Sequence, residues 1–217
     1  MRLPPLLLLL PAAAAQQWDR PPIGWNAWFA FDRDVTEAGV LRNAEALART
    51  GLRELGYRYI NVDDAWQGPR LANGTITSNN VTFPSGIPAL AAQVHALNLS
   101  FGIYTDRGPA TCGGRPASLN HEALDAATYA GWQVDYLKED SCGATHEHEG
   151  AFAQYATMQS ALNASRRPIF FSLCGWMRYY AAAGARGIGQ SWRVGTDCDS
   201  WADFMIKCAP LLAAPCA

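Results

Sequence analysis

Short apolar runs typical of β-strands alternate along this chain with segments of helical periodicity. The strand-like runs occupy residues 23–31, 58–66, 99–106, 134–140, 167–174 and 191–197. Apolar residues recur at helical spacing between them: after Thr36 and Glu37, after Ser85, over 121–132, and from Phe152 to Leu162. Strands separated by helices pair in parallel through right-handed crossovers, so we predict an α/β protein with a parallel sheet.

Two architectures contain such a sheet: an open doubly wound sheet and a closed (β/α)8 barrel. No G-x-G-x-x-G motif follows the first strand, which argues against a dinucleotide-binding sheet. Nearly every strand instead ends in polar or aromatic residues: Trp28, Asp63, Asp64, Tyr104, Asp106, Lys138, Asp140, Arg193 and Asp197. Only a barrel brings all these ends to one mouth. Because six of the eight strands can be counted, we predict a (β/α)8 (TIM) barrel truncated after about six βα units.

The run VDYLKEDSC at 134–142 places three charged residues at the end of an apolar strand. Alternate side chains of a strand share a face, so Lys138 and Asp140 should point one way and Glu139 the other. A cation beside a carboxylate favours the ionised acid, which is the form that a carboxylate nucleophile needs. The alternative is an ordinary ion pair at a strand end.

The N-terminus has the pattern of a secretory signal peptide. Arg2 precedes an apolar run from Leu3 to Leu10, and an alanine-rich stretch follows up to Ala15. We therefore predict a signal peptide at 1–15, a catalytic-type domain at 16–217, and a secreted, extracellular protein. The 217 residues carry a net charge of −2, a balance that favours neither a nucleic acid nor an anionic membrane as partner.

The glycosylation sequons and the cysteines are consistent with the predicted secretion. Four N-x-S/T sequons predict glycosylation at Asn73, Asn80, Asn98 and Asn163. Cys112 and Cys142 follow the ends of neighbouring strands, which lie ~4.8 Å apart, so we predict a disulfide between them, the alternative being two free thiols. Cys174 ends a strand and is expected to be a buried thiol, whereas the sequence does not pair Cys198, Cys208 or Cys216.

Several motifs, in order, carry a resemblance to a known family: IGWNAW, YINVDDAW, FPSGIPALAAQVHALNLSFGIYTD, CGGRPAS, HEALDAATYAGW, VDYLKEDSC, FFSLCGW and SWRVGTD. Together, from about Pro21 to Trp201, they resemble the catalytic barrel of the α-galactosidase (melibiase) family of retaining glycoside hydrolases. The resemblance implies that Asp140 is the nucleophile and Asp197 the acid/base. It implies that the substrate-binding residues are Trp28, Asp63, Asp64, Tyr104, Lys138 and Arg193, and that the Cys112–Cys142 bridge belongs to the family.

Elementary chemistry is compatible with these roles. Hydrolysis with retention needs two carboxyls ~5 to 5.5 Å apart, one ionised and one protonated. Lys138 should lower the proton affinity of Asp140, which leaves Asp197 to cycle between acid and base. Adjacent carboxylates at a strand end suit bidentate binding of vicinal hydroxyls, and Trp28 and Trp66 offer apolar faces for a sugar ring.

Each assignment has a structural alternative. The aspartates Asp63 and Asp64 could instead cap the following loop, Trp28 and Tyr104 could be core residues, and Arg193 could pair with any nearby acid. The histidines are interpreted as structural: His95, His121, His146 and His148. No metal site and no cofactor are predicted.

The chain also departs from the family pattern. Gly175 stands where members often have an acidic or amide residue that reads the 2-position of the sugar, so Met177, Arg178 and Tyr179 would have to supply that recognition, or another substituent is accepted. Ala65 replaces a frequent cysteine whose partner is absent too. The last two strands and the C-terminal β-sandwich of the family are not found in this sequence.

The sequence therefore predicts a glycosidase acting on terminal α-D-galactose of oligosaccharides or glycoconjugates. Related alternatives are glycosidases of the α-N-acetylgalactosaminidase or β-L-arabinopyranosidase type. A non-catalytic carbohydrate-binding fragment is the alternative from another class, since an unclosed barrel exposes sheet edges. A Schiff-base aldolase using Lys138 is disfavoured because neighbouring Glu139 and Asp140 would keep that lysine protonated.

Overall fold

A computed structural model describes residues 21–144, 148–175 and 184–193, together with positions 195, 197, 198, 200 and 202. The predicted signal peptide, His146, Met177, Arg178, Tyr179, Cys208 and Cys216 lie outside the described residues. Within them, no helix has the length and apolar character required to cross a bilayer.

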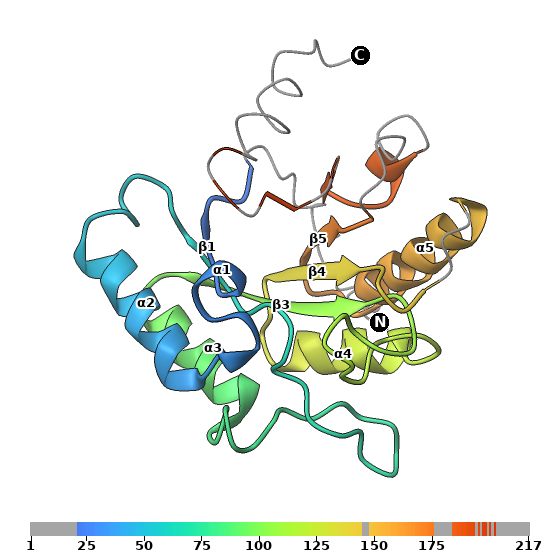
Figure 1. Cartoon of the computed structure of the whole chain (residues 1–217), viewed down its shortest axis with the longest axis horizontal. Helices are drawn as coiled ribbons and strands as arrows, with labels where there is room; N and C mark the ends of the chain where they lie inside the picture. The colour runs from blue at the N-terminus through green and yellow to red at the C-terminus, as the bar shows by residue number, and fades with distance from the viewer. Residues whose placement is uncertain are drawn as a thin grey trace, which may run out of the picture.

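The described chain forms one parallel sheet whose strands follow one another in sequence order (Figure 1). The strands are β1 Gly24–Asn26, β2 Tyr59–Asn61, β3 Ser100–Asp106, β4 Tyr136–Asp140, β5 Phe170–Leu173 and β6 Ser191–Trp192. A doubly wound sheet reverses direction from its first strand, whereas a barrel adds each strand beside the last. The order β1-β2-β3-β4-β5-β6 is therefore that of a barrel, and the sheet curls as half of one.

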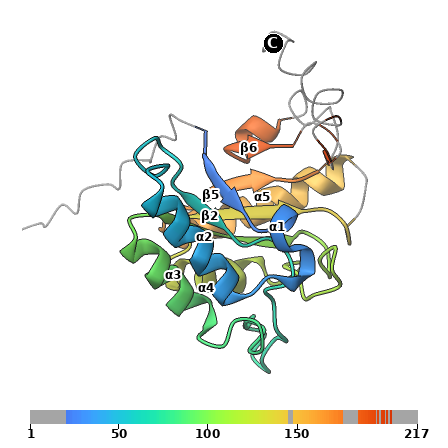
Figure 2. The ribbon, with the colours of Figure 1, turned by 60° about the vertical axis from the view of Figure 1, so that its left-hand side comes forward.

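Helices cover the outer face of this half-barrel, with α2 beside α3 and α4 beside α5 (Figure 2). Their bounds are α2 Glu37–Arg49, α3 Gly86–Ala96, α4 Glu122–Gly131 and α5 His148–Ala164, with a one-turn α1 at Trp28–Phe31 and short 3-10 turns at Asp32–Asp34 and Ala185–Gly187. Thr36 caps α2 as expected, since its hydroxyl accepts the Gly39 N–H at 3.2 Å. Ser85 precedes α3, but in the described structure its side chain makes no capping bond; instead its N–H donates to Glu37 Oε2 at 2.9 Å.

The core lies between the helices and the outward-facing side chains of the strands. Ile60, Phe101, Leu137 and Phe171 are buried there, in one cluster with helical residues that include Val40, Ile87, Leu90, Tyr129 and Met158. Alternation along each strand therefore leaves the opposite set of side chains pointing toward the centre of the half-barrel.

All six strands are shorter than predicted, most of all the first, second and sixth. Residues 23–31 were expected to be extended, but β1 ends at Asn26 and α1 begins at Trp28. The reason is local: Asn26 Oδ1 accepts the Trp28 N–H at 2.9 Å, which turns the chain. The second strand was expected over 58–66, but β2 ends at Asn61. The sixth strand was expected over 191–197, but β6 comprises Ser191–Trp192.

Candidate active site

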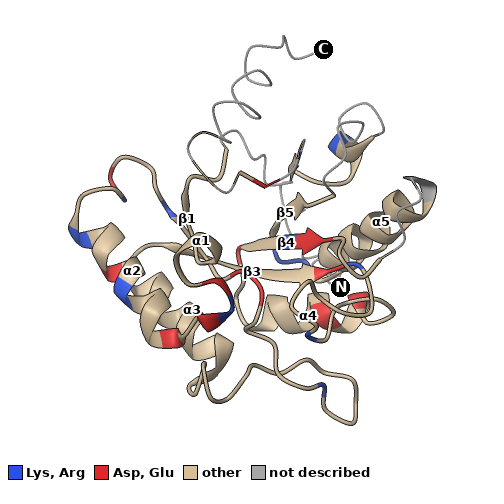
Figure 3. Cartoon of the chain, viewed as in Figure 1, with Lys and Arg blue, Asp and Glu red and all other residues tan. Residues whose placement is uncertain are grey.

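A pocket of about 160 Å³ lies at the carboxyl ends of the strands. Its lining residues are Trp28, Asp63, Asp64, Tyr104, Cys112, Lys138, Asp140, Cys142, Arg193 and Asp197. These are the residues that the sequence placed in the catalytic, substrate-binding and disulfide roles. Acidic positions mark the tips of β3 and β4 in Figure 3, where each strand ends in an aspartate.

Asp140 ends β4 and is 6% exposed. Its Oδ2 accepts a hydrogen bond from the Tyr104 hydroxyl at 3.0 Å, and its Oδ1 accepts the Ser141 N–H at 2.9 Å. Burial raises the pKa of Asp140, while Lys138 and hydrogen bonds from Cys174, Ser141 and Tyr104 oppose that rise. Lys138 lowers the proton affinity of Asp140 as predicted, but the removal of the carboxyl from water outweighs the nearby cation, so the pKa of Asp140 is raised.

Lys138 points into the pocket with Asp140, as the strand alternation predicted, but its ion-pair partner is Asp63. Lys138 Nζ lies 2.9 Å from Asp63 Oδ2 and 5.0 Å from the centroid of the Tyr104 ring. Burial is the largest single effect and opposes the charge on the lysine, but Asp63, Cys174 and Asp140 together outweigh it and raise the pKa of Lys138. The lysine is thus protonated, which argues against a Schiff-base role.

Asp63 and Asp64 both reach the pocket because the chain turns after β2, where Ala65 adopts a φ of 78°. Asp63 also accepts a bond from Asn26 Nδ2 at 2.9 Å. Asp64 accepts the N–H groups of Ala65 and Gly113 at 2.7 and 2.6 Å, so it supports the loop as well as lining the pocket.

Arg193 and Asp197 line the pocket together as an ion pair. Arg193 Nη2 and Asp197 Oδ1 are 2.7 Å apart, and the Asp197 side chain is 59% exposed. Arg193 Nη1 lies 3.6 Å from the sulfur of Cys174, a buried thiol whose pKa burial raises to about 12. Cys174 was predicted to be buried, but its position between Asp140 and Arg193 was not foreseen.

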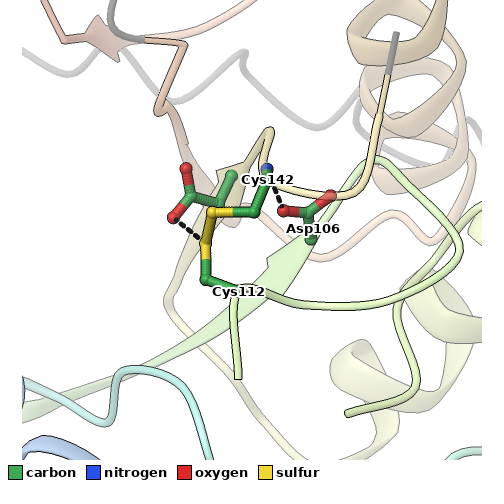
Figure 4. Close-up of side chains that lie close together, drawn as sticks. Asp106, Cys112 and Cys142 are labelled. Atoms are coloured by element: carbon green, nitrogen blue, oxygen red, sulfur yellow. Dashed lines mark hydrogen bonds between the residues drawn. A yellow bond between two sulfur atoms is a disulfide. The ribbon is translucent and has the colours of Figure 1, made fainter. Parts of the chain in front are cut away.

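Cys112 and Cys142 form the predicted disulfide, with Cα atoms 5.0 Å apart (Figure 4). With Asp106 and Asp140 they also make up a group of four potential metal ligands among the described residues. Both sulfurs are bonded to each other, so neither can bind a metal as a thiolate. Asp106 instead accepts the Cys142 and Gly108 N–H groups, each at 2.7 Å, and burial raises its pKa to about 6.

Trp66 does not offer a face to a sugar, contrary to the prediction. Its side chain is fully buried, and its Nε1–H donates to the Tyr104 carbonyl at 2.8 Å. The tryptophan therefore holds the strand that carries Tyr104. Asn26, which sequence reasoning left without a role, holds Asp63 and starts the turn into α1; an asparagine two residues before a helical tryptophan is the signal that could have identified it.

The asparagines of the four sequons are all exposed: Asn73, Asn80, Asn98 and Asn163. His95 pairs with Asp135 at 2.7 Å and does not line the pocket. Gly175 is buried just beyond β5.

A carboxylate-lined pocket at the carboxyl ends of barrel strands is the arrangement of the barrel-type glycoside hydrolases. Comparison with known proteins gives the family. Residues 20–207 match the family model described as alpha galactosidase A. The chain belongs to the α-galactosidase family.

Individual relatives and a solved structure agree with this family assignment. An alpha-galactosidase A of Cellvibrio japonicus is 42% identical over 195 residues, covering 88% of this chain and 48% of that protein. An alpha-galactosidase of Cyamopsis tetragonoloba is 46% identical over 186 residues, covering 83% of this chain and 44% of the relative. The crystal structure of alpha-galactosidase I from Mortierella vinacea superposes with a TM-score of 0.78 at 40% identity, covering 82% of this chain and 46% of that one. The chain thus spans about half the length of the relatives it matches.

Proposed function

We propose that this chain forms the catalytic part of a secreted glycosidase that removes terminal α-D-galactose with retention of configuration. The observation that carries the proposal is that Asp140 and Asp197, distant in sequence, line one sugar-sized pocket. A structure of the alpha-galactosidase from Saccharomyces cerevisiae contains raffinose, and it is 37% identical to this chain with a TM-score of 0.76.

In this proposal Asp140 attacks the anomeric carbon and forms a covalent glycosyl ester. The Tyr104 hydroxyl and the Ser141 N–H hold its two oxygens, so the carboxylate needs little reorganisation when it attacks. Asp197 donates a proton to the leaving oxygen and then takes one from the water that hydrolyses the ester. Its exposure suits that second step, because water must reach it.

The remaining polar groups bind the sugar. The ammonium of Lys138 has three protons and contacts both oxygens of Asp63, at 2.9 and 3.3 Å, which leaves at least one proton available for a sugar hydroxyl. Trp28 lines the pocket and provides an apolar wall for the ring.

The identity of the sugar depends on its 2-position. Gly175 has no side chain to bind a 2-hydroxyl, so we propose to compare nitrophenyl glycosides of α-D-galactose, α-N-acetylgalactosamine and β-L-arabinopyranose. Preferred hydrolysis of the α-galactoside supports the proposal, and preference for either other sugar assigns the related specificity instead.

The reaction itself is tested with the nitrophenyl α-galactoside and NMR of the first-formed anomer. We expect α-galactose as first product and no turnover by Asp140→Ala. Asp34→Ala, at an exposed position outside the pocket, is the matched control and should keep full activity. β-Galactose as first product would contradict retention. Sugar binding without turnover would instead indicate a carbohydrate-binding fragment. This is the second candidate function, because the chain matches only about half the length of its relatives.

Secretion and the division into a signal peptide at 1–15 and a mature domain from residue 16 belong to the same proposal. The exposure of all four sequon asparagines and the Cys112–Cys142 disulfide support it.

A further inference from the structure

The Cys112–Cys142 disulfide lies directly against the carboxylate proposed as nucleophile. Cys112 Sγ is 3.3 Å from Asp140 Oδ2 and 3.2 Å from the Tyr104 hydroxyl oxygen. A disulfide sulfur carries no proton, so the contact with Asp140 is packing rather than a hydrogen bond. The sulfur therefore occupies space beside Asp140 Oδ2 that a water molecule or another donor would otherwise take.

Backbone hydrogen bonds fix both ends of the bridge. The Cys142 N–H donates to Asp106 Oδ2 at 2.7 Å, and the N–H of Gly113, next to Cys112, donates to Asp64 Oδ2 at 2.6 Å. The bridge thus ties the loop after β3 to the end of β4 across a separation of 30 residues. Its position relative to Asp140 is set by the strand ends themselves.

We propose that this disulfide is a positioning element for catalysis: it holds the Asp140 carboxylate in one orientation and keeps water and any donor beyond the Tyr104 hydroxyl away from Oδ2. The proposal rests on the proposed role of Asp140 as nucleophile. A carboxylate that attacks carbon needs a free lone pair, and every additional hydrogen bond to it lowers its nucleophilicity.

Reduction would reverse both effects. Dithiothreitol supplies two electrons and two protons, the S–S bond breaks into two thiols, and the reagent closes to its cyclic disulfide. The new Cys112 thiol is a donor within reach of Asp140 Oδ2, and the loop after β3 loses its tie to β4. Attack by Asp140 should therefore be slower in the reduced protein, and the pKa of Asp140 should be lower, because a hydrogen bond to a carboxylate favours its charged form.

The experiment measures the attack step with 5-fluoro-α-D-galactopyranosyl fluoride, which leaves a slowly hydrolysed ester on the attacking carboxylate. Mass spectrometry follows labelling of the peptide that contains Asp140, in the oxidised and the dithiothreitol-treated protein, across pH. Reduction should slow labelling about tenfold or more and move the acid limb of its pH profile to lower pH. Circular dichroism should remain that of the folded protein.

The double variant Cys112→Ala/Cys142→Ala is the matched control, since it lacks both the bridge and the new donor. Labelling of Asp140 in this variant should be slow, should not change on addition of dithiothreitol, and should show no shift of the acid limb to lower pH. Equal labelling rates in oxidised and reduced protein would overturn the proposal, as would a loss of labelling that only parallels a loss of folded signal. Labelling of the oxidised protein at a residue other than Asp140, or no labelling of it, refutes the proposed function itself and the positioning role with it.

Discussion

Glu139 occupies the outward face of β4, between two residues that line the pocket. Its side chain is fully buried, and neither carboxylate oxygen has a hydrogen-bond partner in the described structure. Burial, followed by the charges of Asp106 and Glu122, raises its pKa well above the ordinary value of 4.5, and Arg107 only partly opposes this. The native protein therefore holds a neutral carboxyl at this position.

This placement makes stability depend on pH in a direction that can be worked out. Above pH 4.5 the unfolded chain releases the Glu139 proton, while the native state retains it up to its higher pKa. The unfolded state then binds fewer protons, so the free energy of unfolding falls by about 1.4 kcal/mol per pH unit. Glu139→Gln has the same shape but does not titrate, so it lacks this loss. The variant should gain stability relative to the wild type as the pH rises above 4.5 toward the native pKa of Glu139, at a rate of up to about 1.4 kcal/mol per pH unit.

Urea unfolding followed by tryptophan fluorescence at several pH values measures the difference. Asp106 and Asp140, whose pKa values burial also raises, are present in both proteins. Their contributions cancel in the comparison as long as native Glu139 is neutral, as glutamine is. Glu45→Gln, at an exposed position of α2, should run parallel to the wild type. Parallel curves for Glu139→Gln and the wild type would refute the reasoning, because they would mean that Glu139 ionises equally in both states.

Other substitutions test the site. Tyr104→Phe removes the hydroxyl that orients the Asp140 carboxylate, so hydrolysis of the nitrophenyl α-galactoside should slow roughly 10- to 100-fold. Because that hydroxyl also lowers the pKa of Asp140, the acid limb of the pH profile should move to higher pH, and an unchanged profile would contradict the contact. Lys138→Met leaves Asp63 buried without its cation, so the free energy of unfolding in urea should fall by about 3 kcal/mol. The double variant Lys138→Met/Asp63→Asn should recover part of that loss, whereas full stability of the single variant would show that the pair contributes nothing. Asn80→Gln should lose one glycan when the chain is expressed in a eukaryotic secretory host, and unchanged gel mobility would speak against modification at that exposed sequon.

Local chemistry predicted most of the site. Lys138 and Asp140 share a strand face because the β period is two, and their place at a strand end assigns them to the mouth of a barrel. The same alternation set Glu139 on the opposite face. Asp63, Asp64 and Asp197 follow the strands that carry them to the mouth, and their roles came from that position together with the family resemblance.

Contacts between distant segments decided the rest. The sequence could not show that Lys138 pairs with Asp63 in the loop after β2, or that the buried Trp66 indole donates to the Tyr104 carbonyl. It also could not show that Cys174 lies beside Asp140. Nor could it give the direction of the pKa shift of Asp140, since burial depends on every strand and loop that surrounds the carboxyl. The sequence by itself determined which side chains meet at the pocket, through strand periodicity and position. Only the tertiary structure decided how those side chains pair and how far water is excluded from them, because pairing and desolvation are properties of the assembled sheet.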